Sequence, residues 1–141
     1  QNYNVVSPTP NAPYAAGQIL PCTVDLFGTS NTDLNLAINL VSAFHGSNVV
    51  LTISTSFIVS KTSSSEKVEN NVTYYEQSVN YQIPDGVATG LYSVVFLERI
   101  TGTEIDIPVN ILGKASNSSS SVDNNSLSVT SPTRSIFQSS S

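Results

Sequence analysis

The chain has 141 residues, enough for one domain of ordinary size, and its 10 acidic and 5 basic residues give a formal charge of -5. This acidic balance argues against a nucleic-acid partner, because contacts to phosphate need clustered lysine and arginine. One histidine and one cysteine exclude any site built from several such ligands, and no apolar run approaches the length that spans a bilayer.

Apolar and polar residues alternate in a series of short runs, which is the pattern of half-buried β-strands. The 34–40 run also matches the start of a helix, but its period of two and its two asparagines favour a strand. In the 91–97 run both parities are apolar, as in a central strand covered on both faces. The predicted strands, in chain order, are 20–26, 34–40, 49–59, 75–83, 91–97 and 105–111.

About seven short strands with no convincing helix predict an all-β fold, an antiparallel β-sandwich of the immunoglobulin-like or fibronectin-like type. Residues 99–104 predict a hairpin that places the last two strands side by side. A turn followed by Gly90-Leu91-Tyr92 opens the penultimate strand, so we assign Tyr92 to a tyrosine corner in which its hydroxyl caps backbone across the loop. The expected core contains Leu36, Ile38, Leu51, Ile53, Val94, Phe96 and Ile107.

Composition divides the chain near Lys114. Residues 1–113 form the predicted sandwich domain, whereas 12 of the 28 residues from 114 to 141 are serine. Such a segment has too little apolar surface to offset the entropy of ordering it, so we expect a disordered Ser/Asn-rich linker or stalk. Serine and threonine beside Pro132 suit O-glycosylation of that stalk.

The chain contains no methionine and starts at Gln1, as removal of a signal peptide would leave it, although a trimmed chain would look the same. Three sequons predict N-glycosylation at Asn71, Asn117 and Asn124. Together these features predict a secreted, extracellular protein.

Short segments at both ends of the predicted domain carry a family resemblance. They are Ser7-Pro8-Thr9, Tyr14-Ala15-Ala16-Gly17-Gln18, Tyr81-Gln82-Ile83-Pro84, Gly90-Leu91-Tyr92 and Ile107-Pro108-Val109-Asn110-Ile111. Over residues 4–112 the chain resembles the yeast cell-wall-synthesis (KRE/KNH-type) domain of fungal Ser/Thr-rich, GPI-anchored surface proteins, with Tyr14 where that family commonly has tryptophan. The resemblance implies a protein of the cell wall or cell surface linked to β-glucan organisation, tied to the membrane only through a GPI anchor. It implies no catalytic residues.

The residues that bear chemistry have simple structural interpretations. Cys22 shares the parity of its apolar neighbours, which predicts a buried, inert thiol. His45 lies in a predicted turn without further ligands. Glu104 and Asp106 share the outer face of the last strand about 7 Å apart, a spacing that overlaps glycosidase carboxylates, but nothing predicts a sugar subsite beside them. We therefore expect no catalytic residue, no cofactor and no metal site; a calcium ion among Asp25, Asp33 and Asp85 is a weaker alternative.

Two function classes remain. The first is a non-enzymatic structural or adhesion module of the cell wall, with wall polysaccharide or neighbouring wall proteins as partners. The second is a carbohydrate-binding module, because sugars stack on exposed aromatic rings. The chain has no tryptophan, and three of its six tyrosines are left as candidate surface rings, namely Tyr3, Tyr14 and Tyr74.

Overall fold

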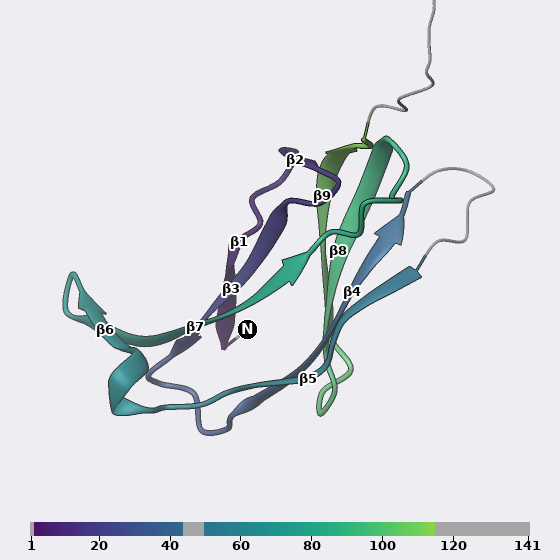
Figure 1. Ribbon diagram of the computed structural model, residues 1–141. Helices are drawn as coiled ribbons and strands as arrows, with labels where there is room; N and C mark the ends of the chain where they lie inside the picture. The colour runs from purple at the N-terminus through teal and green to yellow at the C-terminus, as the bar shows by residue number, and fades with distance from the viewer. Residues whose placement is uncertain (1, 44–49, 115–141) are drawn as a thin grey trace, which may run out of the picture.

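The computed structural model describes residues 2–43 and 50–114 as two β-sheets packed face to face (Figure 1). One sheet has four strands in the order β1-β3-β7-β6, and the other has five in the order β2-β9-β8-β4-β5. No helix in these two ranges is long and apolar enough to cross a membrane. The elements are β1 (Tyr3–Ser7), β2 (Ala12–Ala15), β3 (Ile19–Phe27), β4 (Leu34–Ser42), β5 (Val50–Val59), the 3-10 turn η1 (Ser63–Ser65), β6 (Glu66–Glu69), β7 (Val72–Gln82), β8 (Gly90–Glu98) and β9 (Glu104–Leu112).

The all-β sandwich predicted from alternation is confirmed, and the six predicted runs correspond to β3, β4, β5, β7, β8 and β9. The predicted 99–104 hairpin is also confirmed, because β8 and β9 pair antiparallel. The structure adds three short strands, β1, β2 and β6, so that the described residues form nine strands where about seven were expected. The sandwich is not wholly antiparallel, since β2 pairs parallel to β9 at a sheet edge. Pro13 fits there, because an edge strand loses no ladder bond to a missing N–H.

The core lies between the sheets and follows the predicted parity. Leu36, Ile38, Val94 and Phe96 are buried as predicted, whereas Leu51, Ile53 and Ile107 are partly buried against them. Leu51 and Ile53 are less buried because β5 is an edge strand with irregular register. Ile107 is less buried because β9 pairs with β2 only from Val109 onward, so that β9 forms the edge of the sheet at Ile107.

The expectation that β8 is covered on both faces is wrong for the described residues. Its even-numbered side chains enter the core, but Ser93, Val95 and Leu97 are half-buried on the other face, and Leu91 is 41% exposed. Strand β8 is central in its sheet, between β9 and β4, and this position favours apolar residues on both parities without a second covering layer.

A buried acid organises the β8–β9 turn. Glu98 is only 3% exposed, because it has the parity of the core residues of β8. One carboxylate oxygen accepts the N–H groups of Ile100 and Thr101 at 2.7 and 3.1 Å, and the other accepts the N–H of Asn35 at 2.7 Å. The side chain thus joins the turn to the start of β4 and satisfies three backbone donors.

The predicted tyrosine corner is present. Tyr92 is buried, and its hydroxyl donates to the carbonyl oxygen of Ala88 at 2.8 Å. Tyr92→Phe is therefore expected to lower the free energy of unfolding by about 1 kcal/mol, the usual net value of one such hydrogen bond. Urea unfolding measures it, with Tyr81→Phe as the control, because the half-buried Tyr81 is not at a corner. Equal stability of Tyr92→Phe and the parent chain would show that the corner bond contributes nothing.

Candidate functional site

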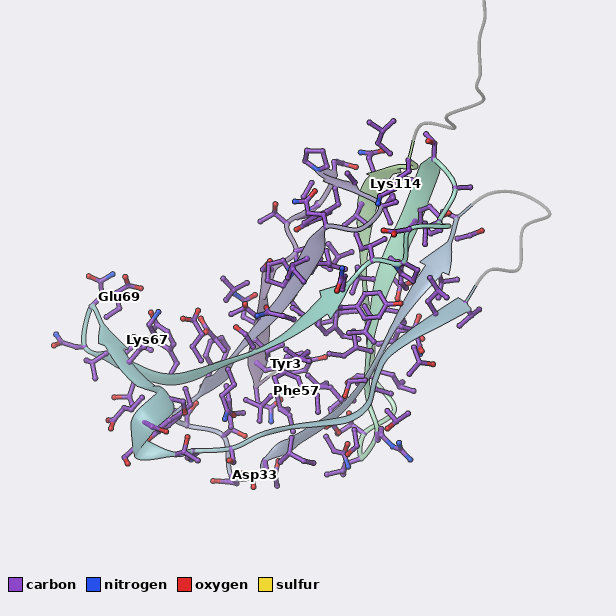
Figure 2. All side chains as sticks on the ribbon, viewed as in Figure 1. Tyr3, Asp33, Phe57, Lys67, Glu69 and Lys114 are labelled. Atoms are coloured by element: carbon purple, nitrogen blue, oxygen red, sulfur yellow. The ribbon has the colours of Figure 1, made fainter. Side chains whose placement is uncertain are left out.

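The three tyrosines predicted to contact sugar lie in different environments. Tyr3 is not a surface ring: it is 3% exposed, because β1 places it opposite Leu26 on the inner side of the sheet (Figure 2). Burial and the charge of Glu98 raise the pKa of its hydroxyl. Tyr14 packs partly against the core at the edge of the five-stranded sheet. Only Tyr74 stands on an open sheet face.

Tyr74 has an aromatic partner that sequence reasoning missed. Phe27 lies directly opposite it in the β3–β7 ladder, and the alternation of both strands turns the two side chains away from the core. Side chains opposite each other in such a ladder have Cβ atoms about 5 Å apart. Phe27 is out of phase with the buried residues of its strand, and this signal was available in the sequence. We call this surface of β3 and β7, with Asp25, Phe27, Tyr74 and Glu76, the aromatic face.

Charged groups surround the two rings. Asp25 and Glu76 are the next outward pair along the ladder, and β6 adds Lys67 and Glu69 beside them (Figure 2). Lys67 forms an ion pair with Glu76, while the Tyr74 hydroxyl donates to Glu69 Oε1 at 2.8 Å. The hydrogen bond from Lys67 lowers the pKa of Glu76, and the bond to Glu69 raises the pKa of Tyr74. Partial burial, and then the neighbouring Glu76, raise the pKa of Asp25 to about 6.

The raised pKa of Asp25 predicts a pH dependence of stability. Between its ordinary value of 3.8 and about 6, the folded chain holds a proton that the unfolded chain has released. This stabilisation is complete below about pH 4 and is lost as the pH rises through about 6, so the free energy of unfolding should fall over this interval. The lowered pKa of Glu76 acts in the opposite direction, but only near and below its ordinary value of 4.5.

Urea unfolding between pH 5 and pH 7 tests the contribution of Asp25, to which the raised pKa of Glu104 adds a change of the same sign. Asp25→Asn should flatten the profile, whereas Asp33→Asn, an exposed carboxylate in the β3–β4 loop, should leave it unchanged. A profile that Asp25→Asn does not alter would contradict the assignment.

A hollow of about 630 Å³ adjoins the aromatic face at the end of the β3–β7 ladder. Gly28 lets the chain after β3 approach β7 closely: its N–H donates to the carbonyl oxygen of Thr73 at 2.8 Å, and a Cβ there would lie 2.8 Å from the same oxygen. Part of the wall of the hollow is apolar, because the Val72 side chain lines it and is 53% exposed. The lining residues are Phe27, Gly28, Thr29, Asn71, Val72, Thr73 and Tyr75.

The sequon residue Asn71 belongs to this wall. It lies in the two-residue turn between β6 and β7, where Asn70 and Asn71 have φ of 53° and 65°. Positive φ at both positions is the mark of a type I′ hairpin turn, and asparagine tolerates that conformation better than most residues. Both asparagines are exposed, so the predicted glycosylation site is open to solvent.

The remaining predicted residues do not join this site. Cys22 is buried, as predicted, and burial raises the pKa of its thiol to about 12. Glu104 and Asp106 lie on the same outer face of β9, and hydrogen bonding to the Asp106 carboxyl raises the pKa of Glu104. His45, Asn117 and Asn124 lie outside the described residues, as does the predicted 114–141 stalk apart from Lys114. Within 2–43 and 50–114 no three His, Cys, Asp or Glu side chains gather as metal ligands.

No protein-family model and no curated protein matches the sequence. Among solved structures, the chain is similar to a β-glucosidase from Listeria innocua in complex with glucose, with a TM-score of 0.49 and 12% identity. It is also similar to that enzyme in complex with gluconolactone, with a TM-score of 0.47 and 10% identity. Each alignment covers 79% of this chain and only 16% of the glucosidase chain.

Proposed function

We propose that the chain is a non-catalytic, extracellular module of the fungal cell wall that attaches to wall polysaccharide through the aromatic face. The observation that supports this proposal best is the pair of rings, Phe27 and Tyr74, placed in register on an outer sheet surface. The family resemblance suggests β-glucan as the polysaccharide.

The chemistry of the aromatic face suits a sugar polymer. The C–H faces of pyranose rings pack on aromatic side chains, while carboxylates and an ammonium at the rim hydrogen-bond the hydroxyl groups. Asp25, Glu76 and Lys67 lie at that rim. Thr23 and Ser78, whose hydroxyls are 2.7 Å apart, extend the polar surface along the same ladder. A long sheet face of this kind accommodates an extended chain of sugars.

The carboxyl groups support a binding role over hydrolysis. Glycosidases hold their two carboxyl groups about 5 to 9.5 Å apart, with the scissile bond between them. In this chain the ion pair with Lys67 occupies Glu76, the ladder partner of Asp25. Glu104 and Asp106 lie opposite Leu97 and Val95, which offer no aromatic ring to a sugar. We therefore propose that the module binds without turnover.

Co-sedimentation with insoluble β-glucan, chitin and whole cell walls tests the proposal on the full chain made without glycans in a bacterial host. We expect binding to at least one of these polymers, and about fivefold weaker binding for Phe27→Ala and for Tyr74→Ala, as the loss of about 1 kcal/mol from one ring contact implies. Tyr14→Ala is the matched control, because it removes a ring at the edge of the other sheet.

Two results would reject this function. Failure of the folded chain to bind any of the polymers would remove the binding role. Release of soluble sugar that Asp25→Asn or Glu104→Gln abolishes would show an enzyme instead.

A second candidate function, docking of a neighbouring wall protein, has one specific observation in its favour. A groove of about 330 Å³ crosses the end of the five-stranded sheet beside Tyr14, and two of its apolar lining residues, Leu91 and Leu112, are 41% and 65% exposed. Cross-linking of the chain in intact walls distinguishes the two: adducts with protein at this groove and none with polysaccharide would favour docking.

A further inference from the structure

We propose that an N-linked glycan on Asn71 folds back into the hollow, packs its first sugars on Phe27 and Val72, and so both stabilises the chain and covers part of the aromatic face. This inference rests on the extracellular setting of the proposed function. It adds to that function a glycan on Asn71 that controls how much of the aromatic face is accessible to polysaccharide.

The first step is position. Asn71 is itself one wall of the hollow, and Thr73, the residue that completes its sequon, is another. The tight turn at Asn70-Asn71 fixes the backbone from which the glycan would emerge. The first sugar of such a glycan is therefore attached at the rim of the hollow.

The second step is chemistry. Phe27 presents a ring to the hollow, and the exposed Val72 presents an apolar surface beside it. The N-acetyl methyl group and the C–H face of N-acetylglucosamine match these surfaces, while the sugar hydroxyls stay in water. The volume of about 630 Å³ lies within the range of about 300–1,000 Å³ typical of small-ligand sites, which accommodates the first one or two sugars.

The third step is effective concentration. A contact between one sugar and one aromatic ring is weak when the sugar is free in solution. A short covalent link raises the local concentration of that sugar to the millimolar range, which favours occupancy of a weak site. The sugar would then hold the β6–β7 hairpin, which projects beyond the body of the sandwich (Figure 1), against the end of β3.

The consequence for function is competition. Phe27 belongs both to the hollow and to the aromatic face, so a glycan packed on it removes one of the two rings that polysaccharide would use. The unmodified chain should bind wall polysaccharide more tightly than the chain modified at Asn71.

The test uses the full chain secreted from a yeast host, with Asn117→Gln and Asn124→Gln in every sample so that Asn71 is the only sequon. Mass spectrometry measures occupancy, and trimming with endoglycosidase H leaves a single N-acetylglucosamine. We expect the trimmed glycoprotein to melt about 4 °C above the Asn71→Gln chain from the same host. It should also bind insoluble β-glucan about fivefold more weakly, the loss expected when one ring contact is blocked.

Phe27→Ala and Val72→Ser provide the decisive comparison. Each should remove the melting-temperature gain from the glycan without changing occupancy, whereas Tyr14→Ala should keep the gain. An unoccupied Asn71, or a gain that survives both substitutions, would overturn the inference. Binding by the bacterial, glycan-free chain is a separate result: its failure rejects the proposed function, while the glycan-dependent gain in melting temperature can still be present.

Discussion

Ile38→Ala is expected to lower the free energy of unfolding by about 2–5 kcal/mol, the largest effect of a single apolar substitution that we predict. Ile38 has no exposed surface, and it lies in β4 opposite Phe96 of β8 on one side and Ser54 of β5 on the other. Truncation removes three methylene or methyl groups and leaves a cavity between two sheets whose backbones are fixed by their ladders.

Ile58→Ala is the matched control for this experiment. It makes the same chemical change on the outer face of β5, where the side chain is 49% exposed, and should cost less than about 1 kcal/mol. Urea unfolding of both variants measures the difference. A cost below about 0.5 kcal/mol at Ile38, the ordinary range for a surface position, would contradict the assignment of its side chain to the core.

The second large effect is expected at Glu98. Glu98→Ala removes the acceptor for three backbone N–H groups and leaves buried donors without partners, which should lower the free energy of unfolding by about 2–4 kcal/mol. Glu98→Gln keeps one acceptor oxygen and should have a smaller effect. Amide hydrogen exchange should show faster exchange at Asn35, Ile100 and Thr101 in the alanine variant.

Glu104→Ala serves as the control, because this exposed acid on β9 should change stability by no more than about 0.5 kcal/mol. If Glu98→Ala is as stable as this control, the carboxylate does not organise the turn, and water satisfies the three donors equally well.

The strands of the core could be predicted because burial on one face imposes a period of two on the sequence. Runs such as 20–26 and 34–40 keep that period over seven residues, and the structure places both as predicted. β1, β2 and β6 could not be found in this way, because they are edge strands of four or five residues with few core contacts. Their position depends on pairing with β3, β9 and β7, which a local pattern does not encode.

The site was less predictable than the fold. Tyr3 was misplaced because its parity was not assigned, and only its pairing with Leu26 shows that it faces inward. Phe27 was detectable from its phase, but its neighbour Tyr74 lies 47 positions further along the chain. Glu98 was also detectable, as an acid in the parity of the core. Its three backbone partners come from two separate segments and required the structure.

The β3–β7 ladder also sets the distance between the two rings and the C-terminal end of the described domain. Phe27 and Tyr74 form one end of the ladder, and Ile19 and Gln82 form the other, about 27 Å away for eight steps along β3. Lys114, the last described residue, lies at that far end, where its ammonium is 3.1 Å from a carboxylate oxygen of Asp85 (Figure 2). In a chain tethered through residues after Lys114, the two rings would therefore lie at the end of the domain farther from the point of attachment.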